Sequence, residues 1–168
     1  MTGQKVKALV TEDIKNVYSI KSDLQNTLDN VENIDMAVKA LSHLKDFSIV
    51  GFNYYYPLAR EAALKIKETC YINTGSYPTG EFIHGHYALL NKSSVFLTFA
   101  TSDISDNELE ILNKIISTYK TKSVIVSDGY DDFNCDILVK FNKCSSKIAT
   151  ILSIIMVIQL IALKCAVK

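Results

Sequence analysis

The chain alternates between short runs of nearly continuous apolar character and longer stretches in which apolar residues recur every three or four positions. The short runs are rich in β-branched and aromatic residues, which is typical of buried strands. The longer stretches have the spacing of helices with one apolar face. Four runs predict strands and a fifth is a weaker candidate: 47–52, 95–100, 123–126 and 136–141, with the weaker one at 70–75.

Helical periodicity occurs both before the first strand and between the strands. Two helices are expected before the first strand, separated by a break near Asn30. We expect this N-terminal helical part, residues 1–45, to pack on the domain formed by residues 46–168 and to make one compact unit with it. The helical segments are Glu12 to about Leu28, Ile34 to Leu44, 57–68 and 107–120. Ser105 followed by Glu108 fits a capping box at the start of the last of these.

Strands that are apolar on both faces and alternate with helices are typical of a parallel sheet that is covered on both sides. The sequence therefore predicts an α/β fold: a three-layer α/β/α sandwich around a doubly wound, mostly parallel five-stranded sheet, preceded by the N-terminal helices. Ligands of such sheets bind where loops follow the carboxyl ends of strands. The candidate loops are 51–56, 100–105 and 127–132, and none contains a GxGxxG or Walker pattern. A dinucleotide or nucleoside triphosphate is therefore not expected.

The C-terminal segment is apolar on all sides. Between Lys147 and Lys164 only Thr150, Ser153 and Gln159 interrupt the apolar residues. This window is shorter than the ~20 residues that a bilayer-spanning helix needs. We therefore predict a buried helix and no membrane span. A helix without a polar face must be covered all round, which favours the sheet on one side and a second subunit or domain on the other.

Composition limits the possible partners. A chain of 168 residues with 48% hydrophobic content can bury one sizeable core. Eighteen basic residues balance eighteen acidic ones, so no overall charge attracts nucleic acid or an anionic membrane, and any anion must be bound locally. The cysteines show no CxxC spacing, which favours reduced thiols in a cytoplasmic protein. They are Cys70, Cys135, Cys144 and Cys165.

Two short segments contain candidate chemistry. Glu61, Lys65 and Glu68 are spaced to share one stripe of the 57–68 helix. They form either a solvated ion pair or a carboxylate whose proton affinity is set by a neighbouring ammonium group. His84 and His86 flank Gly85, but two histidines alone do not make a metal site, and no metal is expected. A loop histidine can instead act as a general acid or base, or simply lie at the surface.

Taken together, these segments resemble the sugar isomerase (SIS) family, and in particular the second SIS domain of glucosamine-6-phosphate synthases and the related fructosamine-6-phosphate deglycases. The family pattern is a helix of the form E-x-A-L-K-x-K-E followed by G-E-x-x-H-G-P-x-A-L. This chain has EAALKIKE at 61–68 and GEFIHGHYAL at 80–89, at the same separation. The resemblance covers about Phe47 to Val167, including IVGFNYYYPLARE and IIMVIQLIALKCAV.

The resemblance implies a set of catalytic roles and no cofactor. Glu68 would be the base that moves a proton between C1 and C2 of an open-chain sugar phosphate. His84 would open the sugar ring, Glu61 would orient that histidine, and Lys65 would lie beside the developing enediolate. Such chemistry requires an acid–base group, a carboxylate and a positive charge near the oxygen that becomes anionic. The predicted substrate contacts are Asn53, Glu81, Thr101 and Ser102, the last two with the phosphate.

The sequence also departs from the family pattern. His86 replaces a proline, Asn53 replaces a glycine, and three tyrosines crowd the first loop. The S-x-S-G-E/D phosphate loop of first SIS domains is absent, and the chain ends before the tail in which synthase-like enzymes carry a further lysine. We therefore expect one SIS half that forms a homodimer or pairs with another SIS domain. The leading hypothesis is a phosphosugar isomerase. The alternatives are a non-catalytic SIS module for sugar-phosphate sensing or oligomerisation, and half of a fructosamine-6-phosphate deglycase.

Overall fold

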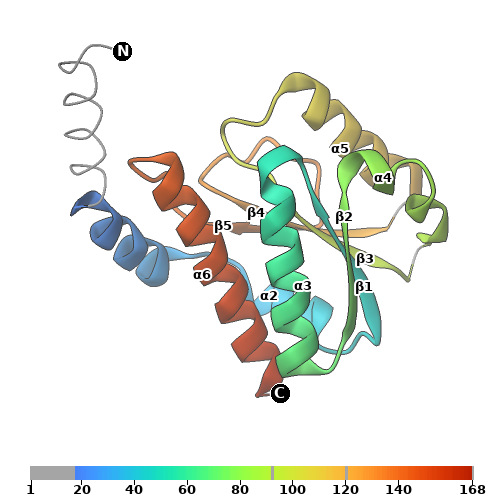
Figure 1. Ribbon diagram of the computed structural model, residues 1–168, viewed down its shortest axis with the longest axis horizontal. Coiled ribbons are helices and arrows are strands. Elements are labelled where there is room, and N and C mark those ends of the chain that lie inside the picture. Colours follow the sequence, from blue (N-terminus) through green and yellow to red (C-terminus); the bar gives the residue numbers. More distant parts are fainter. Residues whose placement is uncertain (1–17, 92, 120, 168) are drawn as a thin grey trace, which may run out of the picture.

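The computed structural model describes residues 18–91, 93–119 and 121–167 and contains a five-stranded sheet (Figure 1). The strand order is β2-β1-β3-β4-β5, and every neighbouring pair is parallel. The α/β fold class with a doubly wound parallel sheet is thus confirmed. The strands are β1 (Asp46–Gly51), β2 (Asn73–Pro78), β3 (Val95–Phe99), β4 (Lys122–Ser127) and β5 (Ile137–Lys140).

Alternate residues of the central strands enter two separate cores, one on each face of the sheet. In β3, Leu97 packs in one core and Phe96 in the other, because successive side chains of a strand point to opposite faces. Ile125 of β4 likewise faces away from its neighbours Val124 and Val126. All five residues of β3 are buried. The nearly continuous apolar runs in the sequence therefore reflect a sheet covered on both sides.

Helices cover the two faces unequally. Helices α2 (Ile34–Leu41), α3 (Tyr56–Cys70) and α6 (Lys147–Ala166) pack on one face, where α3 and α6 lie side by side (Figure 1). Helices α4 (Thr79–Phe82) and α5 (Asp106–Tyr119) contribute to the core on the other face. Two 3-10 turns, η1 (Asn53–Tyr55) and η2 (His86–Leu89), follow β1 and α4 respectively. Residues 18–30 are also helical.

The observed strand boundaries differ most from the predicted ones at the weak strand candidate, 70–75. Strand β2 begins three residues later, at Asn73, because α3 continues to Cys70. Tyr71 then ends the helix with a left-handed backbone, φ 57°. At the start of α5 the capping box is confirmed: the Ser105 amide donates to Glu108 Oε2 at 2.9 Å, and the Glu108 amide donates to Ser105 Oγ at 3.4 Å.

Helix α6 is longer than the apolar window suggested, since it runs for 20 residues. By length and composition it could cross a membrane, but half of its most apolar window is buried inside the domain. Ile154 and Val157 are fully buried beside α2 and α3. Its outer surface keeps exposed apolar side chains: Ile148, Leu152 and Leu163. This is the packing of a core helix with an apolar outer face still uncovered in one chain.

The N-terminal part joins this layer. Helix α2 packs against α6, and the Glu32 amide donates to the Lys140 carbonyl at 2.8 Å on the free side of β5. Thr27 donates to Ser153 of α6 at 2.9 Å in a buried hydrogen bond. The predicted helical residues before 18 lie outside the described residues. The division between residues 45 and 46 stays a prediction.

Candidate functional site

The three charged residues predicted to share a stripe of α3 do lie together. Lys65 Nζ is 3.0 Å from Glu68 Oε2 and 3.8 Å from Glu61 Oε1. The hydrogen bond to Glu68 and the charge of Glu68 raise the pKa of Lys65, and Glu61 adds to this effect. Lys65 therefore stays an ammonium group at neutral pH. All three side chains are at least one-third exposed, so the stripe is open to a ligand or to another chain.

Backbone constraints hold α3 in place. Helix α3 begins five residues after the end of β1, and a Cβ on Gly51 would lie 2.4 Å from Tyr56 Cα, so only glycine fits this close approach. Thr74 of β2 donates to the Ala63 carbonyl at 2.9 Å. Cys70 Sγ donates to the Ala162 carbonyl of α6 at 3.3 Å. The charged stripe is thus carried by a helix that is fixed to both β2 and α6.

His84 lies in the loop after α4. Its amide donates to the Glu81 carbonyl at 3.2 Å, and its side chain is exposed. Glu81 is exposed in α4 as well. His86 has a different environment, because its ring lies 4.0 Å from the Tyr77 ring, centre to centre. The histidine that stands in place of the family's proline therefore packs on β2.

Within one chain, Glu68 and His84 lie near opposite ends of the sheet. Helix α3 runs back from the carboxyl end of β1, so Glu68, near its last turn, is close to the start of β2. His84 follows α4, which begins just after the carboxyl end of β2. A six-residue strand spans roughly 20 Å. Figure 1 shows the end of α3 at the bottom of the view and α4 near the top. One chain alone does not bring the two groups together.

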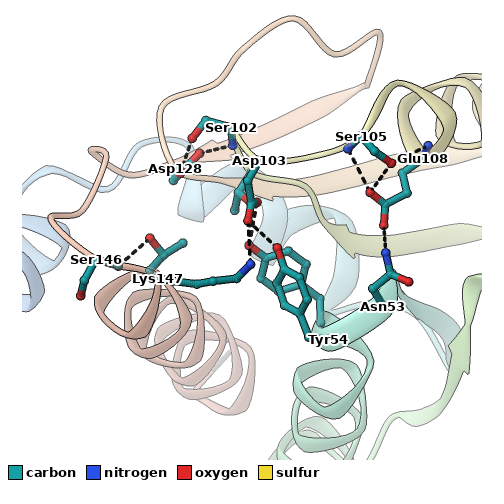
Figure 2. Close-up of polar contacts among 12 residues, drawn as sticks. Asn53, Tyr54, Ser102, Asp103, Ser105, Glu108, Asp128, Ser146 and Lys147 are labelled. Carbon is teal, nitrogen blue, oxygen red and sulfur yellow. Dashed lines mark hydrogen bonds and ion pairs between the residues drawn. The ribbon is translucent and has the colours of Figure 1, made fainter. Parts of the chain in front are cut away.

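The loop after β3 holds the predicted phosphate contacts, Thr101 and Ser102, and both hydroxyl groups bind other side chains of the protein. Figure 2 shows Ser102 beside Asp128. The Ser102 amide and hydroxyl donate to Asp128 at 2.7 and 2.9 Å. The Thr101 hydroxyl lies 2.6 Å from the Tyr55 hydroxyl and also donates to Asp103. Thr101 is 1% exposed. The sequence identified the loop and its hydroxyl groups but missed the carboxylates that they bind.

Asp103 is the centre of this network. It accepts hydrogen bonds from Thr101, Tyr54 and Tyr55, and Lys147 Nζ lies 3.1 Å from its Oδ2. Burial raises the pKa of Asp103, but these donors and the charge of Lys147 outweigh it and hold the pKa at about 2. Burial also raises the pKa of the Tyr55 hydroxyl. Asp103 is thus a carboxylate at any pH near neutrality.

Asn53 belongs to a second set of contacts at the same edge (Figure 2). Its side-chain amide donates to Glu108 Oε1, and the other oxygen of Glu108 accepts from Ser105 in the capping box. Asn53 has a left-handed backbone, φ 42°, a conformation that asparagine tolerates better than most residues. The residue that replaces the family's glycine therefore links η1 to α5.

Two larger depressions lie away from this network. One, of about 260 Å³, is lined by Ser48, Tyr77 and His86 among others. The other, of about 380 Å³, lies beside the charged stripe and is lined by Arg60, Glu61 and Ser76 among others. Among the described residues no group of three or more histidine, cysteine, aspartate or glutamate side chains could hold a metal ion. The four cysteines are free thiols.

The chain was compared with protein families, curated proteins and solved structures. No family model matches the chain. It is 32% identical over 118 residues to a glutamine–fructose-6-phosphate aminotransferase (isomerizing) of Caldanaerobacter subterraneus subsp. tengcongensis. That match covers 70% of this chain but only 18% of the relative, so the chain spans less than a fifth of that enzyme's length.

Solved structures agree with this relationship. The C-terminal domain of glucosamine-fructose-6-phosphate aminotransferase from Francisella tularensis superposes with a TM-score of 0.82 and 26% identity, over 99% of this chain and 46% of that one. The sugar isomerase domain of an RpiR transcription factor from Sphaerobacter thermophilus shares the fold with a TM-score of 0.74 and 14% identity, over 92% of this chain and 89% of that one. In sequence and in fold, the chain is therefore a sugar isomerase (SIS) domain, homologous to the C-terminal part of the glutamine–fructose-6-phosphate aminotransferases.

Proposed function

We propose that this SIS domain binds a sugar phosphate and catalyses proton transfer between C1 and C2 of its open-chain form, as an aldose–ketose or amino-sugar phosphate isomerase does. The observation that carries the proposal is the position of Lys65 between Glu61 and Glu68. The arrangement sets an ammonium group beside a carboxylate on an accessible helix face. Proton abstraction next to a carbonyl needs both groups.

Each group has a defined task in this reaction. Glu68 removes the proton from one carbon and returns it to the other, while the hydroxyl proton passes between O1 and O2 of the enediolate, so that the sugar neither gains nor loses a proton over the cycle. Lys65 stabilises the oxygen that becomes negative in the enediolate. The raised pKa of Lys65 supports this role, because the residue stays charged while a base acts beside it. His84 opens the sugar ring, and Glu61 orients the histidine that approaches it.

The distance between Glu68 and His84 requires two chains. Because the two residues lie near opposite ends of the sheet in one subunit, a site that contains both must take Glu68 from one chain and His84 from another. The exposed apolar residues of α6 supply a physical reason to associate, since a second chain would remove them from water. A homodimer is the simplest assembly that places the same two residues in two equivalent sites.

Deuterium exchange from solvent tests the reaction. We expect the chain to exchange the C1 proton of fructose 6-phosphate or the C2 proton of glucosamine 6-phosphate, detected by NMR. Glu68→Gln should reduce the rate by at least about 100-fold, the effect of removing a general base. Glu110→Gln, at an exposed position of α5, is the matched control and should exchange normally. Equal exchange by wild type and Glu68→Gln would refute the role of Glu68.

Mixing two inactive variants tests the shared site. Glu68→Gln and His84→Gln chains should each be inactive. An equal mixture should recover about a quarter of the wild-type rate, because half of randomly formed dimers are mixed and each of these has one intact site. Failure to recover activity, in a mixture shown to exchange subunits, would mean that Glu68 and His84 serve the same subunit. An active His84→Gln chain would instead mean that His84 has no catalytic role.

A second candidate function is a non-catalytic SIS module that binds a sugar phosphate for sensing or supports oligomerisation. The engaged hydroxyl groups of Thr101 and Ser102 favour the oligomerisation form of this module, because they leave the usual phosphate-binding edge without free donors. A sensing module would bind the sugar phosphate without exchange that depends on Glu68, and an oligomerisation module would show neither. Half of a fructosamine-6-phosphate deglycase would use the same residues, and release of the amine would identify it.

A further inference from the structure

The depression beside the charged stripe lies between α3 and the outer strand β2. It has a volume of about 380 Å³. Arg60, Glu61 and Lys67 line it from the helix, and Ser76 lines it from the strand. Because β2 is at the edge of the sheet, no further strand from the described part of the chain covers this side. A ligand can therefore enter it directly from solvent.

The depression has an excess of positive charge. Arg60 and Lys67 are exposed, and neither forms an ion pair with a residue that the structure describes. They are seven residues apart, two turns of helix, so they lie on one stripe roughly 10 Å apart along the axis. The only carboxylate among the lining residues is Glu61, and Lys65 lies 3.8 Å from it. Two positive charges thus remain for a ligand.

The first turn of α3 adds to this potential. The depression extends to Pro57, and the N-terminus of a helix carries the positive end of the helix dipole. Arginine suits a phosphate particularly well, because its planar group can donate two parallel hydrogen bonds. The Ser76 side chain adds a hydroxyl donor from the opposite wall.

The carboxyl edge of the sheet provides fewer free hydrogen-bond donors and less space for an anion. There Asp103, Asp128 and Glu108 accept the hydrogen bonds that a phosphate would need. The depression between the loops after β1 and β3 measures about 10 Å³, room for about one water molecule. A phosphate at this position would displace a carboxylate or be repelled by it.

We propose that the phosphate of the sugar substrate binds between Arg60, Lys67 and Ser76, on the flank of α3 and not at the carboxyl edge of the sheet. The proposal rests on the proposed function, since it assumes a sugar phosphate as the ligand. The open sugar chain then extends along α3 towards Lys65 and Glu68. Phosphate binding and proton transfer are thereby assigned to neighbouring stripes of one helix.

Calorimetric titration of the purified chain with fructose 6-phosphate, inorganic phosphate and fructose tests the site. Arg60→Gln and Lys67→Gln should each weaken binding of the two phosphates about threefold, and the double variant about tenfold, the scale of exposed charge contacts. Binding of the phosphates should also weaken with added salt. Lys39→Gln, which removes an exposed charge from α2, is the control and should bind normally.

The proposal is overturned if the double variant binds fructose 6-phosphate as tightly as wild type, if Lys39→Gln weakens binding as much, or if wild type binds fructose and fructose 6-phosphate equally. The test of the phosphate subsite can be distinguished from the test of catalysis. Loss of phosphate binding in the double variant, with no exchange by wild type, would support the subsite and refute the isomerase. Exchange that depends on Glu68 but not on Arg60 and Lys67 would support the isomerase and refute the phosphate subsite.

Discussion

Lys147 Nζ lies 3.1 Å from Asp103 Oδ2, which joins the first turn of α6 to the loop after β3. The same ammonium group lies 3.6 Å from the centre of the Tyr54 ring. Tyr54 itself donates a hydrogen bond to Asp103, so three elements distant in sequence meet at one carboxylate (Figure 2). The carboxyl edge of β1 and β3 is thereby closed by an internal ion pair.

We predict that Asp103 makes the stability of the domain depend on pH in acid. Its pKa in the folded protein is about 2, below its ordinary value of 3.8. Because the folded value is the lower one, the contribution is complete above about pH 4 and is lost as the pH falls towards 2. The side chain is 43% exposed, so we expect about 1 kcal/mol and not the full value of the shift. Urea unfolding of wild type and Asp103→Asn from pH 2 to 6 measures it.

For that experiment Asp132→Asn is the control, since Asp132 is an exposed loop residue. The stability difference between wild type and Asp103→Asn should shrink between pH 4 and pH 2, while the control should follow wild type throughout. A difference that stays constant over this range would contradict the assignment of the low pKa to Asp103.

Lys147→Gln should lower the free energy of unfolding by about 0.5 to 1 kcal/mol at pH 7, because it removes an exposed ion pair and a cation–π contact. In the double variant with Asp103→Asn the two losses should not add, since the residues are in contact. Four unfolding curves give the coupling free energy. A coupling of zero would mean that Lys147 does not stabilise Asp103.

Ser105→Ala should cost about 1 kcal/mol, because it removes the hydroxyl that accepts from the Glu108 amide and donates to the Glu108 carboxylate. Loss of these two bonds also loosens Glu108, the partner of Asn53. Ser117→Ala is the control, since that exposed hydroxyl donates only within α5, to the Lys114 carbonyl, and it should cost much less. Chemical denaturation measures both. Equal losses of stability in the two variants would mean that helix propensity, and not the capping hydrogen bonds, causes the effect.

Ile154→Ala should cost about 2 to 5 kcal/mol, since Ile154 is 0% exposed in the core between α6 and the sheet. Ile148→Ala, on the outer face of the same helix at 55% exposure, should cost less than about 1 kcal/mol. Urea unfolding measured in aqueous buffer compares the two. A helix that spanned a membrane would not give this asymmetry.

The sequence was sufficient for the fold because the sheet is covered on both faces. A run such as 95–100, in which Thr98 is the only polar residue, is typical of a central strand that is buried on both faces. Strand β2, NTGSYP, was the exception. Its only apolar side chains are Tyr77 and Pro78, so the sequence does not show the alternation of apolar and polar residues that is typical of a strand. Its place at the edge of the sheet explains that composition, because among the residues that the structure describes no strand pairs with its outer side.

The candidate site was predictable only where contacts are local. The stripe of Glu61, Lys65 and Glu68 follows from helical spacing alone. The link between Asp103 and Lys147 does not, because nothing in a sequence reports which loop a distant helix end will approach. A signal was present nonetheless: Asp103 and Asp128 each follow a predicted strand in the loops where ligands bind, and carboxylates there compete with an anionic ligand.

The pairing of α3 with α6 also bears on how the domain folds. Cys70 of α3 and Ala162 of α6 are joined by a hydrogen bond across a sequence separation of 92 residues. Contacts of such long range form late, because closing a large loop costs entropy before the contact is made. During synthesis, the apolar face of α3 cannot pack against α6 until α6 has left the ribosome. Partly synthesised chains are therefore expected to expose the apolar residues of α3 that share a core with α6.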